Sequence, residues 1–332
     1  MDRPISRSFK VSFSLAAENT GGVAERKGFH VMGSGSAAHR HGGGWRSAAK
    51  GAAEGFFAAV PRTTPAQRAV ILAYHSVAAE PTRASTAQSV FRSHLSWIAE
   101  HCEVVPFEKL ASGGIQRGDG SRPTVAITFD DGYEDNHRDA LPLLASHGLP
   151  ATFFITTGLV DRDELALARL RRAWGPRERS LRPISIEQLR EMDSAGMAFG
   201  AHSRTHPNLR MLDENALMNE IAGSRDRLEE ILQRRVSAFA YPFGDARFHI
   251  SATAVAVAAT NGFTSAATID YRGVSRTTDP LLIPRFPVSN DPVEILRAKV
   301  FGRLDLIGAW RERVPGWITG PLSSGRRRGE GP

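Results

Sequence analysis

The sequence predicts a protein of the α/β class, built from buried parallel strands that alternate with amphipathic helices. Apolar runs without turn residues have the composition of core strands, and they occupy residues 68–74, 124–129 and 151–156, with a shorter apolar segment at 197–199. Segments with a helical spacing of apolar residues lie between these runs. A strand, a helix and a second strand joined by a short return form the βαβ unit of a parallel sheet or barrel.

The first strand is expected to end at His75, and an amphipathic helix follows it. The inward face of this helix is predicted to consist of Phe91, Leu95 and Ile98. A short extended piece is expected at 104–107. The only cysteine, Cys102, excludes a disulfide framework and a cysteine-based zinc site, and we expect it to be a buried structural thiol.

Further helices are expected after the second strand. One covers residues 137–147 and stops at Gly148. Another opens with a capping box formed by Ser185 and Gln188. A long helix is expected over 213–234, and its inward stripe is predicted to consist of Leu217, Ile221, Leu228, Ile231 and Leu232. The arginine-rich segment 161–183 fits either a solvated helix and loop or a groove wall that meets a polymer.

The positive charge belongs to the two ends of the chain. The formal net charge is +7, and residues 1–66 hold nine basic and four acidic residues while 310–332 hold five and two. The segment between them is therefore close to neutral, which argues against a nucleic-acid-binding face. We expect 1–66, rich in Gly, Ser, His and Arg, and 314–332 to be disordered tails. The folded domain is expected over 67–290, with a terminal helix over 291–313.

No segment of the chain reaches the ~20 consecutive apolar residues that span a bilayer, so no transmembrane segment is expected. The basic residues Arg3, Arg7 and Lys10 precede a short apolar run at 11–17, but two serines interrupt this run and the segment is not a convincing signal peptide. A cytoplasmic location and a location at the cell envelope both stay open.

Two adjacent carboxylates end the strand at 124–129. Asp130 and Asp131 follow it directly, and Gly132 lets the backbone turn just past them. Because like charges raise each other's pKa, two ionised carboxylates at one strand end need a positive partner. A bound metal ion is the obvious candidate.

Two histidines four residues apart, His202 and His206, follow another short apolar segment at 197–199. Together with one of the two carboxylates they provide three protein ligands and leave a fourth position open, which is the pattern of a catalytic zinc site. The remaining carboxylate is then free to act as a base. Each motif alone occurs by chance in many chains, whereas the pair in this order is a specific signal.

Thr128–Gly132 and His202–His206 resemble the first two motifs of the polysaccharide deacetylases, the NodB-homology domain of carbohydrate esterase family 4. The resemblance covers roughly residues 67–290. It implies a distorted, incomplete, seven-stranded (β/α) barrel and one divalent metal ion, expected to be Zn²⁺. It makes Asp131, His202 and His206 the metal ligands and Asp130 the catalytic base.

The third motif of this family, Arg-x-Pro-Tyr/Phe, matches in part. Pro242 and Phe243 agree with it, but Ala240 stands in the place of the arginine that orients the catalytic aspartate. The resemblance is therefore strongest to the branch that acts on poly-N-acetylglucosamine, in which an arginine after a late strand substitutes. In this chain that residue is Arg285, although an ordinary surface arginine is the alternative.

The usual C-terminal Leu-x-His motif is also missing, because the last histidine of the chain is His249. In the poly-N-acetylglucosamine branch a histidine after the first strand takes the general-acid role, which makes His75 the candidate and His249 a poorer one. The backbone N–H at Phe243 is the candidate oxyanion donor. Pro242 and Tyr133 are expected beside the substrate.

The resemblance implies a hydrolase that removes N-acetyl groups from an N-acetylglucosamine-containing polysaccharide, such as an exopolysaccharide or a cell-envelope glycan. The alternatives are a zinc hydrolase of the same fold that acts on peptidoglycan, chitin oligomers or O-acetyl esters, and a degenerate domain that only binds glycan. The distance of Arg285 and His75 from Asp130 and the metal distinguishes the last alternative from the others.

Overall fold

A curled parallel sheet forms the centre of the fold. The computed structural model of the chain describes residues 68–79, 85–111, 122–174 and 181–305. In this part of the chain the strand order is β10-β1-β5-β6-β7-β8-β9, and β4 pairs with β5 off this path. The strands are β1 (Ala69–Tyr74), β4 (Glu103–Val104), β5 (Thr124–Phe129), β6 (Thr152–Ile155), β7 (Ala198–Ala201), β8 (Ala238–Ala240), β9 (Ser265–Ala267) and β10 (Phe286–Pro287).

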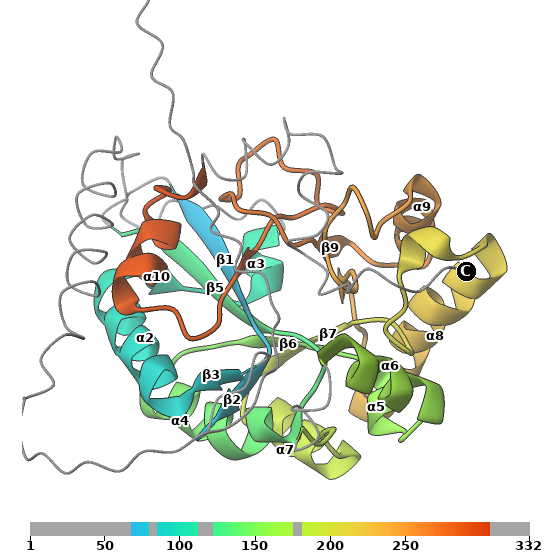
Figure 1. Cartoon of the computed structure of the whole chain (residues 1–332), viewed down its shortest axis with the longest axis horizontal. Coiled ribbons are helices and arrows are strands. Elements are labelled where there is room, and N and C mark those ends of the chain that lie inside the picture. Colours follow the sequence, from blue (N-terminus) through green and yellow to red (C-terminus); the bar gives the residue numbers. More distant parts are fainter. Residues whose placement is uncertain (1–67, 80–84, 112–121, 175–180, 306–332) are drawn as a thin grey trace, which may run out of the picture. The chain divides into compact units, whose positions relative to one another are not determined.

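The two edges of the sheet meet through a short stretch of backbone bonds. A single parallel bridge joins Ala267 to Ile283, just before β10. Next to it, the N–H of Asp270 donates to the carbonyl of Arg285 at 2.9 Å. All pairings along the path are parallel. This arrangement confirms the distorted, incomplete (β/α) barrel (Figure 1).

Side chains alternate between the inside of the curled sheet and the helices outside it, as the period of a strand requires. Large residues of β1 and β5, such as Leu72 and Phe129, pack in the main core with Phe91 and Leu95 of the first helix. The other face of the strands forms a second cluster that is rich in alanine; its strand members include Ala69, Ala126, Phe154, Ala238, Ala240 and Ala267. The interior therefore has room for a large side chain.

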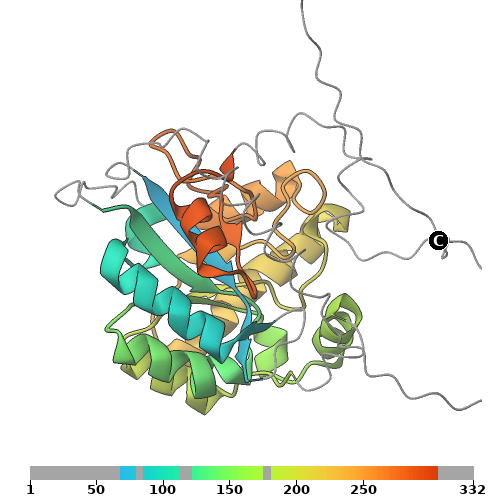
Figure 2. The same ribbon diagram turned by 60° about the vertical axis from the view of Figure 1, so that its left-hand side comes forward.

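The helices lie around the curled sheet (Figures 1 and 2) and cover the outer face of its strands. The inner face is buried within the curl, so both faces of the strands are buried. They are α2 (Gln88–His101), α3 (Phe107–Ala111), α4 (Leu141–Ser146), α5 (Thr157–Val160), α6 (Glu164–Trp174), α7 (Ile186–Ser194), α8 (Glu214–Leu232), α9 (Ala252–Thr260) and α10 (Val293–Val300). A small parallel pair, β2 (Ser76–Ala78) and β3 (Ser85–Ala87), follows β1.

Several local predictions are confirmed. The capping box of Ser185 and Gln188 opens α7. The predicted stripe of α8 is buried, and Asp213 caps its first turn. Gly148 adopts a φ of 62° just after α4, which is the left-handed conformation that glycine favours at a helix end. Cys102 is buried, and burial raises the pKa of its thiol to about 12, so it is an inert structural residue.

Other predictions were wrong in detail. The extended piece expected at 104–107 ends early, because Phe107 begins α3. The helix expected over 137–147 starts with a π-helical turn, Asn136–Ala140, before α4. The terminal helix expected over 291–313 is α10, which ends at Val300. Beyond residue 305, and for the tail at 1–66, the predictions lie outside the described residues.

The helices within the described ranges are all too short or too polar to cross a lipid bilayer.

Candidate active site

The predicted site residues gather where several strands end. His75 follows β1, Asp130 and Asp131 follow β5, and His202 follows β7. Parallel strands bring their carboxyl ends to one edge of a sheet, which is where barrel enzymes hold their active sites. The long-range proximity of these residues is therefore a direct consequence of the strand topology.

Three of these side chains form a group that could hold a metal ion. Asp131 Oδ1 lies 3.5 Å from His202 Nε2 and 3.4 Å from His206 Nε2. One ligand atom from each residue lies within 4.8 Å of the others. Two imidazoles and one carboxylate at this spacing could hold one divalent metal ion.

Hydrogen bonds behind the group fix the orientation of two ligands. His202 Nδ1 lies 2.7 Å from the carbonyl oxygen of Ala240, and donation to that carbonyl leaves Nε2 as a lone-pair donor. The hydroxyl of Tyr133 donates to Asp131 Oδ2 at 2.7 Å, and Oδ1 of the same carboxylate faces the histidines. Tyr133 is fully buried, so its hydroxyl bonds to the Asp131 carboxylate and does not face the substrate side, where it was expected.

The ionisation states suit metal binding. Burial lowers the pKa of His206 to about 4, which leaves its imidazole neutral at pH 7. Burial alone would raise the pKa of Asp131, but His206, His75 and His202 outweigh this effect and hold it below its ordinary value. A neutral imidazole and an ionised carboxylate are the forms that bind a metal ion.

Asp130 forms a bidentate pair with Arg285. Arg285 Nη1 donates to Asp130 Oδ1 and Nη2 donates to Oδ2, both at 2.7 Å. Both side chains are buried, with exposed fractions of 0% for Arg285 and 4% for Asp130. Burial would raise the pKa of Asp130, but the Arg285 guanidinium and then His202 hold it at about 2. Arg285 is therefore no ordinary surface arginine.

Arg285 reaches this position through the interior of the curled sheet. Its Nη1 also donates to the hydroxyl of Thr128 at 3.1 Å, and its Nε donates to the carbonyl of Thr268 at 3.2 Å. The guanidinium carbon lies 5.2 Å from the centre of the Phe154 ring, within the range of a cation–π contact. These contacts from several strands fix the plane of the guanidinium and, through it, the plane of the Asp130 carboxylate.

His75 lies in the electrostatic environment of both aspartates, because it contributes to lowering the pKa of Asp130 and of Asp131. Its backbone carbonyl accepts a hydrogen bond from Asn136 Nδ2 at 2.8 Å. The next residue, Ser76, donates to the buried carboxylate of Asp135 at 2.5 Å. Asp135 and Asn136 thus hold the backbone at His75, and sequence reasoning did not single them out.

The third-motif segment lies next to the histidines. Phe243 is 44% exposed, and its ring centre is 4.7 Å from that of His206. Both Phe243 and Gly244 have a positive φ, and a Cβ on Gly244 would lie 2.6 Å from the backbone nitrogen of Ile269. Pro242 is buried. His249 packs against the far side of this segment, 5.1 Å from the Phe243 ring.

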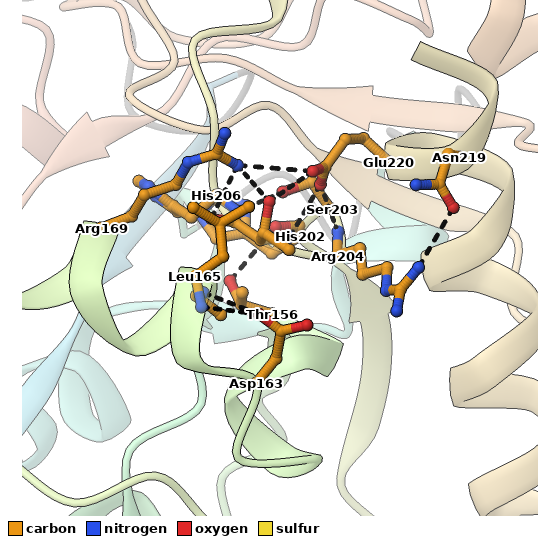
Figure 3. Close-up of polar contacts among 12 residues, drawn as sticks. Thr156, Asp163, Leu165, Arg169, His202, Ser203, Arg204, His206, Asn219 and Glu220 are labelled. Carbon is orange, nitrogen blue, oxygen red and sulfur yellow. Dashed lines mark hydrogen bonds and ion pairs between the residues drawn. The ribbon is translucent and has the colours of Figure 1, made fainter. Parts of the chain in front are cut away.

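Sequence reasoning also missed a polar group behind the histidine loop (Figure 3). Arg169 of α6 turns toward Thr205 and Glu220, so this arginine is engaged with the protein interior. A signal existed for Glu220, because it occupies the buried stripe of α8, where an unpaired carboxylate is rare. Residues 175–180 of the arginine-rich segment lie outside the described residues.

Comparison with known proteins agrees with this geometry. Residues 117–266 match the family model described as polysaccharide deacetylase. YxkH of Bacillus subtilis (strain 168), which carries a polysaccharide deacetylase name, is 26% identical over 175 residues, which are 52% of this chain and 56% of YxkH. The chain therefore spans little more than half the length of that relative.

A second relative covers more of the chain. The poly-beta-1,6-N-acetyl-D-glucosamine N-deacetylase of Staphylococcus aureus (strain MRSA252) is 25% identical over 221 residues, or 64% of this chain and 70% of the relative. Among solved structures, the Streptococcus pyogenes deacetylase PplD in complex with acetate has a TM-score of 0.58 at 21% identity, and covers 70% of this chain and 98% of its own. IcaB from Ammonifex degensii has a TM-score of 0.57 at 23% identity, and the match covers 70% of this chain and 97% of the IcaB chain. These structures share the fold.

Proposed function

We propose that this chain, whose residues 117–266 match the polysaccharide deacetylase family model, is a metal-dependent hydrolase that removes N-acetyl groups from an N-acetylglucosamine polysaccharide. The observation that carries this proposal is the bidentate pair of Asp130 and Arg285 beside the Asp131, His202 and His206 group. A domain that only binds glycan has no use for a buried carboxylate that an arginine orients and keeps ionised. An exopolysaccharide or a cell-envelope glycan is the proposed substrate class.

In this proposal Asp131, His202 and His206 hold one Zn²⁺ ion. Supporting observations are the spacing of their ligand atoms, the neutral His206 and the hydrogen bond that leaves His202 Nε2 as a lone-pair donor. When bound, Zn²⁺ supplies Lewis acidity, which lowers the pKa of water and polarises an amide carbonyl.

Asp130 accepts the proton of the attacking water. An acetamide is a poor electrophile, so a positioned base contributes about 10²–10⁴-fold to its hydrolysis. Each oxygen of Asp130 accepts one hydrogen bond from Arg285 and keeps a second lone pair for water. Arg285 is a positioning residue in this scheme, since it fixes the carboxylate plane and its charge.

The remaining roles concern the oxyanion and the leaving amine. The backbone N–H at Phe243 donates to the developing oxyanion, a contact of a kind worth about 3 kcal/mol. The exposed Phe243 ring and the buried Pro242 beside it shape the substrate side of the site. His75 donates a proton to the departing amine, and its proximity to both aspartates supports this role. Tyr133 orients Asp131 from behind.

Acetate release from defined oligomers tests this function. The full chain, loaded with Zn²⁺, is incubated with β-1,6-linked and β-1,4-linked N-acetylglucosamine oligomers, with peptidoglycan and with an O-acetylated glycan. Asp130→Asn should bind Zn²⁺ as the wild type does and release no acetate. Asp193→Asn, which alters an exposed pair with Arg234, is the matched control and should remain active.

The outcomes separate the alternatives. Preferred release from β-1,6 oligomers supports a poly-N-acetylglucosamine substrate. Release only from peptidoglycan, chitin-type β-1,4 oligomers or the O-acetyl ester would move the assignment to that substrate. No release from any of them by a protein that binds Zn²⁺ would overturn the catalytic proposal, and an active Asp130→Asn variant would overturn the assignment of the base.

A further inference from the structure

A buried carboxylate on α8 holds the loop that carries the two histidines (Figure 3). Glu220 Oε2 accepts hydrogen bonds from the backbone N–H of Arg204 at 3.0 Å and of Thr205 at 2.7 Å. Glu220 Oε1 accepts from the hydroxyl of Thr205. One side chain thus binds the loop at consecutive residues between His202 and His206.

Arg169 of α6 completes this group. Its Nη1 donates to the Thr205 hydroxyl and lies 3.4 Å from Glu220 Oε1. The side chain of Glu220 is 9% exposed and that of Arg169 is 33% exposed, so the guanidinium partly offsets a charge that burial would otherwise destabilise. We call Glu220, Thr205 and Arg169 the histidine-loop clamp.

The histidine loop needs such a clamp because its backbone is strained. Ser203 has a φ of 62° and His206 a φ of 57°, the left-handed region that disfavours residues other than glycine. A left-handed conformation is unfavourable for an L-residue, so the surrounding structure must impose it. The two N–H groups that Glu220 accepts belong to the residues between these two positions.

Other contacts hold the opposite side of the loop. The N–H groups of Thr157 and Gly158 at the start of α5 donate to the carbonyls of Ser203 and Arg204, at 3.3 and 2.8 Å. The carbonyl groups of Ser203 and Arg204 therefore bond to α5, and the N–H groups of Arg204 and Thr205 bond to Glu220, while the N–H of His206 donates to Ser203 Oγ at 3.0 Å. This pairing satisfies the backbone of a buried, irregular segment from both sides.

The two histidines depend on the clamp to different degrees. His202 begins the loop, and its ring is fixed by the hydrogen bond to the Ala240 carbonyl. His206 follows Thr205 directly, so the direction of its side chain is set by the backbone that Glu220 holds. A movement of Thr205 by a fraction of an ångström would displace His206 Nε2 from its 3.4 Å approach to Asp131.

We propose that the histidine-loop clamp positions His206 for metal binding and thereby sets the metal affinity of the site. Glu220 is a positioning residue in this role, because it acts through the loop backbone. The inference rests on the proposed function, in which His206 is a metal ligand. Outer groups that orient metal ligands typically contribute 10–100-fold in metal affinity, and we assign Glu220 a contribution of that size.

The Zn²⁺ dissociation constant tests the clamp without any substrate. The full-length apoprotein competes with a chromophoric chelator for Zn²⁺ at 25 °C, and circular dichroism first checks that each variant is folded. Glu220→Ala should raise the Kd about 10–100-fold. Glu229→Ala is the matched control, because Glu229 on the same helix also accepts a backbone N–H, that of Val236, but does so away from the histidine loop. The Kd of this control should equal that of the wild type.

A second pair of variants covers the case in which Glu220→Ala does not fold. Thr205→Val keeps the volume of the side chain and removes the hydroxyl that bonds to Glu220 and Arg169, whereas Thr205→Ser keeps that hydroxyl. The clamp predicts weakened Zn²⁺ binding in the valine variant and recovery of most of the affinity in the serine variant. A purely structural role would lower the melting temperature of Thr205→Val and leave the Kd of the folded protein unchanged.

The results distinguish the clamp from the proposed function. Tight Zn²⁺ binding by the wild type with an unchanged Kd in Glu220→Ala, or in Thr205→Val, would overturn the clamp alone. A raised Kd in these variants, in a protein that releases no acetate from any glycan, would support the clamp and overturn the proposed reaction. Failure of the wild type to bind Zn²⁺ would overturn both.

Discussion

Removing Arg285 should destabilise the protein strongly and make its stability depend on pH. The perturbation is Arg285→Met, which keeps most of the side-chain length and removes the charge. Arg285 is fully buried and donates to both oxygens of Asp130, so the substitution leaves a buried carboxylate without its counter-charge. Breaking a buried ion pair from one side lowers the free energy of unfolding by about 3–5 kcal/mol.

The pH dependence has a definite sign. In the wild type the pKa of Asp130 is about 2 in the folded state, below its ordinary value of 3.8, so its stabilising effect is complete at pH 5 and above. Without the guanidinium, burial dominates and raises the folded pKa above the ordinary value. Stability of Arg285→Met should then fall as the pH rises through that raised pKa, so the loss relative to wild type should be larger at pH 8 than at pH 5.

The double variant Arg285→Met/Asp130→Asn measures the coupling of the pair. Because each single substitution leaves a buried polar group with an incomplete set of partners, we expect the two losses to overlap by about 2–3 kcal/mol. Urea unfolding at pH 5 and pH 8 gives all four free energies. Arg234→Met is the control, since Arg234 pairs with Asp193 at the surface and should contribute about 1 kcal/mol or less. A loss below about 1 kcal/mol for Arg285→Met, or equal losses at both pH values, would refute the reasoning.

Three further predictions concern the surroundings of the site. Burial raises the pKa of Asp135 from 3.8 to about 6, so the contribution of this carboxyl group to stability should fall as the pH rises from 4 to 7; urea titrations should show the free energy of unfolding of Asp135→Asn rising relative to that of the wild type over this range, and a constant difference would contradict this. In Gly158→Ala the new Cβ would overlap the carbonyl oxygen of Arg204, so calorimetry should show a stability loss of about 1–3 kcal/mol; a wild-type melting temperature would be inconsistent with the close approach. Tyr133→Phe removes the donor to Asp131 Oδ2 and should raise the Zn²⁺ Kd about tenfold; unaltered affinity would show that the hydroxyl is dispensable for binding.

Strands β1, β5 and β6 were predictable from the sequence because each is a continuous apolar run, whereas β9 (Ser265–Ala267) and β10 (Phe286–Pro287) are too short to leave such a pattern. The run at 124–129 coincides with β5. Buried parallel strands need an apolar composition along their whole length, so a short stretch of sequence is enough to recognise one. The proximity of Asp131 and His202 followed from the same pattern, since the Asp130–Asp131 pair and His202 follow the ends of β5 and β7, and parallel strands end at one edge.

The supporting residues were harder to predict because their partners are remote in the chain. Arg285 pairs with Asp130 across 155 positions, and the residues alone do not specify that contact; the resemblance to a deacetylase branch supplied it. Glu220 sits within the apolar stripe of α8, next to Ile221, and its function depends on a loop that begins at His202. A charged residue in a buried helix stripe can be recognised in the sequence as unusual, but the sequence does not show which residue it contacts.

The composition of the barrel interior explains how an arginine at 285 can replace one at 240. The small side chains of Ala238, Ala240 and Ala267 line the same interior cluster as Phe154, over whose ring the Arg285 guanidinium lies. An arginine at 240 would extend from this same face of the sheet, because Ala240 belongs to the interior cluster. Ala240 retains a role through its backbone, because its carbonyl accepts from His202 Nδ1 whatever its side chain is. The third-motif segment thus still holds the His202 ring through the carbonyl of Ala240, and the bond to Asp130 comes from Arg285 beside β10.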